Sequence, residues 1–584
     1  MLEDEQLQDG QGGIELDLAL VAIVAAAVWC VHFARNFAGL WAPDAMEYAD
    51  VARNIATGNG ITTHSIWTML LAKYHQLPFP SLLRPPLYPL LMSLLFRVTG
   101  PTETSAVFLC GLAYVATVIP LFILVMRFFG RTAAWLAAML YIFHNEALYY
   151  SISGLTEPVA TLFFMVFLCV FFLGEGALSV FIAGVMLGLE HATSDKALPC
   201  FVVALAFALT KGARKWNWRA PALLALGFVL VLAPFILYNL IHFGVLPYNK
   251  ADPNVALMLG PSLTAGNLRS VHPMSAWTFA TTHPGMLLNK FLNFFQGFTH
   301  VALFGPDSVV SPYIMVFALL GLFIKRAGGA ATRCYSYVLI SLLVQIFALS
   351  FLYYVESRYL MSFAPVLIGF AAGWFVSQIE QISVRPVLRY GIAVLLVWVA
   401  LDPVGTLHSL MGWGEFSDQY KSAHESAYVK ELLGKHTAAN AVVVTDVPWA
   451  TAWYGQRTSI LFPVTMEELA EIDANLIPVE AVLLTSQMNA SFRSKFTWTS
   501  DAWWRNILES KLLEFGVVIS RKEAVYKKVD ENKSARGNAV LLVKRPVTAA
   551  DLKDAYSKHP TLPRWIAPLK SGGGAAPTNP ESKP

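Results

Sequence analysis

The chain has 584 residues, of which 56% are hydrophobic and only 14% are charged. Soluble domains carry about 25% charged residues, so this composition excludes an ordinary soluble protein and predicts one that is buried in a membrane. The formal net charge of +3 is too close to neutral to favour a nucleic-acid partner.

Apolar segments recur along the first 400 residues, and most approach the ~20 residues that a membrane-spanning helix needs. They predict a polytopic α-helical membrane protein with about 11 spans, at 18–34, 104–126, 133–150, 156–173, 177–191, 196–210, 220–241, 309–324, 334–355, 359–377 and 387–401.

Lysine and arginine residues orient these spans. With the N-terminus inside, 11 of them fall in inner loops, and the short outer loops hold only Lys196 and Arg358. Because positive residues gather on the cytoplasmic side, we expect a cytoplasmic N-terminus in a plasma or inner membrane. Two long loops, at about 35–103 and 242–308, then lie outside.

The composition changes at about residue 402, where charge returns and apolar runs shorten. Alternating strand and helix patterns there predict an extracytoplasmic α/β domain. The predicted division is a transmembrane domain at 1–401, the α/β domain at 402–570 and a disordered tail at 571–584. The expected strands lie at 441–445, 459–462, 481–485 and 540–543, and the helical patterns lie at 423–434, 465–474 and 503–515.

Asp44 begins a short amphipathic helix in the first outer loop, which Gly58 and Gly60 end. This helix could lie on the membrane surface or pack on the spans. One interpretation is a capping box, with Asp44 as N-cap and Glu47 at the third helical position. The other is a carboxylate at the membrane boundary that takes a proton from an acceptor hydroxyl. Both can hold, since capping would orient the side chain.

Other charged residues are expected at the same outer face. Two prolines fix the backbone beside Arg84, which could hold a phosphate or orient Asp44. Glu157 opens the fourth span, where a favourable helix start explains it equally well. We interpret Lys196 and Arg358 as ligands for the phosphate of a lipid carrier. The alternative for every one of these cations is a side chain that reaches the lipid headgroups.

Two motifs carry a family resemblance. Residues 43–60 read Pro-Asp, a Tyr four residues after the Asp, then Ala-Arg-Asn-Ile and Gly-x-Gly, and residues 84–89 read Arg-Pro-Pro-Leu-Tyr-Pro. In this order they resemble the GT-C-type membrane glycosyltransferases, in particular the superfamily of protein O-mannosyltransferases and lipid A aminoarabinose transferases. That family often has Asp-Glu adjacent, whereas Ala45 follows Asp44 here and Glu47 is the next acid.

The resemblance implies an inverting glycosyltransferase of the cell envelope, with Asp44 as catalytic base and Glu157 as a second carboxylate. It implies a polyprenyl-phosphate-linked sugar as donor and a lipid, glycan or protein as acceptor. Arg358 and Tyr359 match the family's Arg-Tyr motif, and Glu47 joins the expected substrate-binding residues. No cofactor is implied; the acidic residues would permit a divalent cation without demanding one. The alternatives are a transporter or flippase for an anionic lipid-linked substrate, and a non-catalytic assembly protein.

Overall fold

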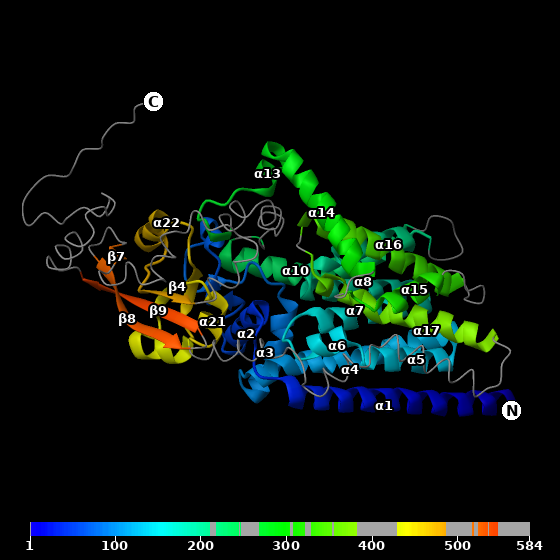
Figure 1. Ribbon diagram of the computed structural model, residues 1–584. Coiled ribbons are helices and arrows are strands. Elements are labelled where there is room, and N and C mark those ends of the chain that lie inside the picture. Colours follow the sequence, from blue (N-terminus) through cyan, green and yellow to red (C-terminus); the bar gives the residue numbers. More distant parts are fainter. Residues whose placement is uncertain are drawn as a thin grey trace, which may run out of the picture.

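The structure is a computed structural model that describes residues 2–210, 218–244, 246, 268–303, 308–321, 329–352, 355–381, 429–485, 517–518, 524–534 and 537–546. Long helices fill one end of an elongated molecule and a β-sheet fills the other, with the N-terminus at the end away from the sheet (Figure 1). The predicted span at 387–401, the helical pattern at 503–515 and the tail at 571–584 lie outside the described residues.

Helices dominate the described part of the chain. Six stretches are long and apolar enough to cross a membrane, at Gly13–Asn36, Glu103–Phe129, Gly176–Thr193, Arg219–Phe243, Gly329–Leu352 and Ser357–Gln381. They confirm six of the predicted spans and a helical membrane protein. The helices are α1 (Leu2–Asn36), α2 (Pro43–Ala56), α3 (Leu87–Thr99), α4 (Glu103–Phe129), α5 (Arg131–Ile142), α6 (Asn145–Ser151), α7 (Glu157–Leu173), α8 (Gly176–Thr193), α9 (Leu198–Ala208), α10 (Arg219–Phe243), α13 (Ala276–Thr282), α14 (Pro284–Leu303), α15 (Pro312–Leu320), α16 (Gly329–Leu352), α17 (Ala364–Gln381), α21 (Pro448–Trp453) and α22 (Met466–Glu471).

Four other predicted spans correspond to shorter helices. The segment 133–150 divides into α5 and α6, and 156–173 forms α7 with 17 residues. The segment 196–210 forms the 3₁₀ turn η2 (Asp195–Ala197) followed by α9. Within 309–324 the described helix is α15, with nine residues. A helix rises about 1.5 Å per residue, so length alone does not make these four helices spans.

Glycines bring α8 and α10 into close contact. A Cβ added at Gly184 would collide with the backbone of Leu224, and one added at Gly227 would meet the backbone carbonyl of Phe181. Small residues at helix interfaces let backbones approach closely within a membrane, where apolar burial drives little association. The backbones of α8 and α10 therefore pack directly on each other.

The sheet has seven strands in the order β2-β5-β4-β6-β9-β8-β7. Strands β2, β5, β4 and β6 run parallel, whereas β9, β8 and β7 pair antiparallel. Four of the strands confirm the strands expected from the C-terminal sequence, while the edge strand β2 comes from the first long loop. The strands are β2 (Ser65–Ile66), β4 (Val442–Thr445), β5 (Thr458–Leu461), β6 (Ala481–Thr485), β7 (Val517–Val518), β8 (Ala524–Ser534) and β9 (Gly537–Pro546), with a separate pair of β1 (Thr62–Thr63) and β3 (Phe79–Pro80).

Helix α2 lies between the long helices and the sheet (Figure 1). Its alanine face, with Ala45, Ala49 and Ala52, is buried in the core formed by the long helices. The polar face is buried as well, because the loop that follows α2 and the sheet cover it. Of the two locations expected for this helix, packing on the spans is therefore correct.

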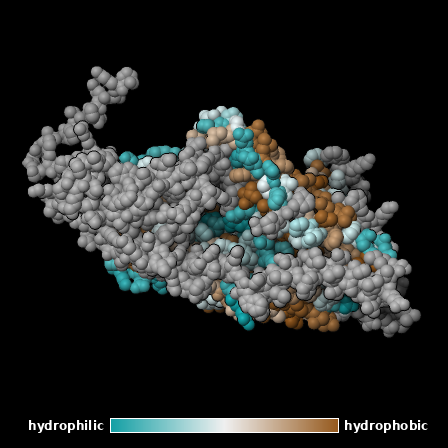
Figure 2. Space-filling model, viewed as in Figure 1, coloured by the Kyte–Doolittle hydropathy of each residue, from teal (hydrophilic) through white to brown (hydrophobic). Residues whose placement is uncertain are grey.

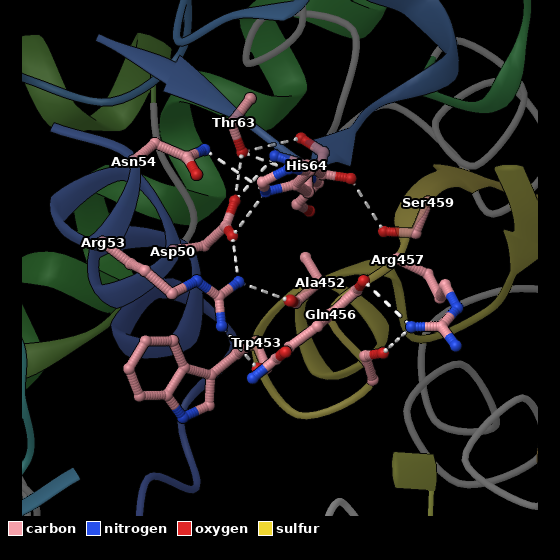
Figure 3. Close-up of polar contacts among 12 residues, drawn as sticks. Asp50, Arg53, Asn54, Thr63, His64, Ala452, Trp453, Gln456, Arg457 and Ser459 are labelled. Atoms are coloured by element: carbon pink, nitrogen blue, oxygen red, sulfur yellow. Dashed lines mark hydrogen bonds and ion pairs between the residues drawn. The ribbon is translucent and has the colours of Figure 1, made fainter. Parts of the chain in front are cut away.

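A polar hub ties the end of α2 to the sheet (Figure 3). The buried Asp50 carboxylate pairs with Arg53 at 2.6 Å and accepts hydrogen bonds from the backbone and ring of His64 at 2.6 and 3.0 Å. Arg53 also donates to the carbonyls of Ala452 and Trp453 in α21, at 2.7 and 2.9 Å. The hub therefore fixes α2 against a segment about 400 residues later in the chain.

Candidate active site

Asp44 lies between two arginines that come from distant parts of the chain. Nη2 of Arg84 is 2.7 Å from Asp44 Oδ1, and Nη1 of Arg358 is 3.1 Å from Asp44 Oδ2. Arg84 belongs to the loop before α3, and Arg358 belongs to the 3₁₀ helix η4 (Ser357–Phe363). Both carboxylate oxygens are thus held by cations, while 28% of the Asp44 side chain stays exposed.

The expected capping box is absent. Helix α2 starts two residues earlier than that interpretation required, with Ala42 as N-cap, Pro43 in the first turn and no side-chain cap. Proline favours the first helical position because its missing N–H is not needed there. Asp44 is therefore free of a capping role and its carboxylate points to the two arginines instead.

Glu47 shares Arg84 with Asp44 but is otherwise engaged. Its Oε1 accepts hydrogen bonds from Trp67 Nε1 at 2.7 Å and from Ser65 Oγ at 3.1 Å, and its Oε2 contacts Arg84. Because Ser65 belongs to β2, Glu47 connects the sheet to the arginine that orients Asp44. The Glu47 carboxylate is therefore held between Arg84 and the segment that carries Ser65 and Trp67.

A second ion pair lies beyond Arg358. Lys196 Nζ is 3.4 Å from Glu157 Oε1 and 4.0 Å from the centre of the Tyr359 ring. Nη2 of Arg358 is 3.4 Å from the Tyr359 hydroxyl. The seven residues singled out from the sequence therefore form one connected cluster: Asp44, Glu47, Arg84, Glu157, Lys196, Arg358 and Tyr359.

The cluster opens into a pocket with about 350 Å³ of empty space, part of it open to solvent. Figure 2 shows hydrophilic residues gathered near the middle of the molecule, with hydrophobic residues over the helical part. The pocket is lined by Glu157, Ala160, Glu190, Ser194, Lys196, Ala197, Cys200, Gln345, Arg358, Tyr359, Ser362 and Phe363.

The electrostatics of the cluster keep Asp44 ionised. Burial raises the pKa of Asp44, but Arg84, Arg358 and Lys196 outweigh it and hold that pKa well below its usual range. Glu47 differs, because burial, although opposed by Arg84, raises its pKa. Two neighbouring carboxyl groups whose pKa values are pushed apart are typical of sites that move protons.

Two more polar residues belong to the pocket. Glu190 ends a predicted span, and the sequence indicated that it could line a cavity together with Glu157, whereas nothing pointed to Gln345 inside α16. Both line the pocket beside Lys196 and Arg358. A polar side chain within an otherwise apolar span was the signal available for each. Within the described ranges, no group of three or more His, Cys, Asp or Glu residues is placed to hold a metal ion.

Residues 83–238 match the family model of the dolichyl-phosphate-mannose-protein mannosyltransferases. The matched segment is a little over a quarter of the chain and contains Arg84, Glu157 and Lys196, whereas Asp44 and Arg358 lie outside it. The match confirms the resemblance to membrane glycosyltransferases that the motifs indicated. No curated protein matches the sequence.

Several solved structures are similar to the chain at low sequence identity. ArnT from Cupriavidus metallidurans, bound to undecaprenyl phosphate, has 12% identity and a TM-score of 0.48, over 90% of this chain and 97% of that chain. The archaeal oligosaccharyltransferase AglB from Archaeoglobus fulgidus was solved in complex with an inhibitory peptide and a dolichol-phosphate. It has 13% identity and a TM-score of 0.49, over 81% of this chain and 70% of that chain. The arabinofuranosyltransferase AftD from Mycobacteria has 14% identity and a TM-score of 0.45, over 90% of this chain and 41% of that chain.

Proposed function

We propose that this protein is a GT-C-type glycosyltransferase that moves a sugar from a polyprenyl-phosphate carrier to an acceptor hydroxyl. One observation carries the proposal: Asp44 is held between two arginines, and one of them, Arg358, also lines the pocket. In the proposal Asp44 is the base and its neighbour Arg358 is a phosphate ligand. The family match supports the class of reaction and of donor, since a dolichyl-phosphate sugar is a polyprenyl-phosphate sugar.

In the proposed reaction the donor's phosphate binds at Lys196 and Arg358. The acceptor oxygen attacks the anomeric carbon as Asp44 takes the hydroxyl proton. The bond between the anomeric carbon and the phosphate oxygen breaks, and the electron pair leaves with the polyprenyl phosphate. The two cations stabilise the charge that develops on that phosphate. Attack opposite the leaving group inverts the anomeric centre.

Donor binding also prepares the base. Without donor, Arg358 pairs with both Asp44 and Glu356, and its charge helps to lower the pKa of Asp44, which makes Asp44 a weak base. A bound phosphate brings a negative charge close to Arg358 and Asp44. A like charge nearby raises the pKa of a carboxyl group, so Asp44 becomes a stronger base once the donor is in place.

The proposal includes an orientation in the membrane. The 11 inner-loop cations argue for a cytoplasmic N-terminus and put the cluster and the sheet at the outer face. Asp17, near the start of the candidate span Gly13–Asn36, pairs with Arg131 at the start of α5, which is consistent with one inner face for both. We propose about 11 spans in all, an extracytoplasmic α/β region within 402–570, and a lipid, glycan or protein acceptor at the outer surface.

Replacing Asp44 with Asn tests the proposal. The asparagine keeps the size of the side chain but cannot take a proton, so sugar transfer should fall by at least about a hundredfold. The assay is transfer from a set of polyprenyl-phosphate sugars by the purified full-length protein, with Glu431→Gln as control because Glu431 is exposed and belongs to a remote surface pair. Full transfer by Asp44→Asn would remove the proposed base. Movement of the lipid-linked sugar across the membrane of vesicles that contain the protein, without a new glycosidic bond, would indicate a transporter instead.

A further inference from the structure

One wall of the pocket is polar, although it is formed by apolar helices. Glu190 comes from the end of α8 and Gln345 from the outer half of α16, and both line the same pocket as Glu157 from α7. Their exposed fractions are 6% for Glu157, 3% for Glu190 and 3% for Gln345. Three long polar side chains from three helices thus converge on one small space.

Each of these side chains has an acceptor oxygen that the protein leaves unsatisfied. Among the residues the structure describes, none hydrogen-bonds to Glu157 Oε2, Glu190 Oε2 or Gln345 Oε1. The Ser362 hydroxyl interacts with the Glu190 carboxyl group, and Lys196 takes the other oxygen of Glu157. Buried polar atoms are nearly always hydrogen-bonded, so three unsatisfied acceptors in one pocket indicate a ligand that donates.

The chemistry of this wall excludes two parts of a lipid-linked donor. An ionised phosphate diester offers only acceptors, and it would face acceptors and an acidic side chain here. A polyprenyl chain offers no hydrogen bonds at all, so it would leave the three oxygens unsatisfied. A sugar ring carries several hydroxyl groups, each of which can donate one hydrogen bond and accept others. The ring is therefore the part of the donor that fits.

We propose that Glu190, Gln345 and the free oxygen of Glu157 form a subsite that binds the hydroxyl groups of the donor's sugar. The inference rests on the proposed function and gives the donor a direction in the pocket. Its phosphate lies at Lys196 and Arg358, and its ring turns toward α8 and α16. The wall thereby sets which sugars are accepted, because a ring without a matching hydroxyl leaves a buried acceptor unpaired.

The test compares binding of polyprenyl phosphate with binding of the same lipid carrying mannose, glucose or a pentose. It uses the full-length protein in nanodiscs and the variants Glu190→Leu, Glu190→Gln and Gln345→Leu. The matched controls are Glu175→Gln, at the exposed opposite end of α8, and Gln378→Leu, which lies outside the pocket on α17. Melting temperatures and transfer rates are measured on the same preparations.

We expect the wild type to bind at least one sugar-bearing lipid more tightly than polyprenyl phosphate. Glu190→Leu and Gln345→Leu should each lower the affinity for that lipid by about tenfold, while polyprenyl phosphate binds as tightly as it does to the wild type. Glu190→Gln should retain much of the affinity, since an amide still accepts from a hydroxyl. The controls should match the wild type.

Three results would overturn the subsite. The first is an equal loss of affinity for polyprenyl phosphate and for the sugar-bearing lipid in the leucine variants. The second is an unchanged sugar preference in those variants. The third is a wild type that binds every sugar-bearing lipid no more tightly than polyprenyl phosphate. Selective binding without any transfer would refute the proposed function and leave the subsite standing.

Discussion

Arg84 sets the charge of the proposed base, and its removal has a measurable consequence for the dependence on pH. Its guanidinium contacts both Asp44 and Glu47, and only 15% of the side chain is exposed. Arg84 is the strongest of the cations that lower the pKa of Asp44. In Arg84→Gln the pKa of Asp44 therefore rises, since burial remains and Arg358 alone stays in direct contact.

The size of the effect follows from the geometry. An opposite charge within about 4–6 Å lowers the pKa of an aspartate by about 1–3 units, so the acid limb of the transfer rate should move up by about 1–3 pH units in Arg84→Gln. The wild type keeps Asp44 ionised at a pH where the variant has begun to protonate it. Glu47, whose pKa burial already raises, takes up a proton in the variant and so avoids a buried unpaired charge.

The assay is the initial rate of sugar transfer between about pH 3 and pH 8, with melting temperatures measured in the same buffers. Arg97→Gln is the matched control because Arg97 is exposed on α3, close in sequence to Arg84. Arg84→Lys keeps the charge and should leave the acid limb near its original place. An acid limb that stays in place in Arg84→Gln, with Asp44→Asn inactive, would show that Arg84 does not control the ionisation of the base.

Three further predictions concern the hub, the helix packing and the phosphate site. His64 and Arg53 outweigh burial and lower the pKa of Asp50 to about 2. The stabilisation that the Asp50 carboxylate gives the protein is therefore complete above about pH 4 and is lost as the pH falls through about 2. Asp50→Asn should lower the melting temperature at pH 7, and this deficit should vanish toward pH 2. Gly184→Leu should destabilise the protein by about 1–3 kcal/mol in thermal unfolding because α10 blocks the added side chain, whereas Gly329→Leu, at a glycine with open space, should be neutral. Lys196→Gln should weaken polyprenyl phosphate binding by about tenfold, and Lys435→Gln, at an exposed remote site, should not.

Much of the charged cluster was predictable because topology restricts where a charge can lie. The count of inner and outer cations put Lys196 and Arg358 at the face expected for Asp44, and the structure brings Asp44 and Arg358 into contact. Strand residues near 442 and 481 were also recognisable, since buried parallel strands are short continuous apolar runs. These signals are local or follow from charge alone.

Other features left no sequence signal that could decide between alternatives. Asp44 and Glu47 have capping-box spacing, yet Pro43 lets the helix begin early and frees Asp44 for the arginines. Strand β2 has two residues, too few for any period to show. The Asp50 hub depends on backbone carbonyls of α21, whose positions follow from the completed fold. Contacts of this kind form between segments hundreds of residues apart and cannot be read from either segment.

The distance along the chain between Asp44 and Arg358 also bears on how the enzyme is made. The two residues are separated by 314 positions, so the ribosome finishes the base long before the cation that completes its surroundings. Glu190 and Gln345 are likewise synthesised at different times and come to line one pocket only after α16 has been made. A stalled or truncated chain that ends before η4 therefore has Asp44 and Lys196 but lacks Arg358, one of the two proposed phosphate ligands. Under the proposed mechanism such a fragment cannot complete the phosphate site, so transfer has to await the synthesis of η4.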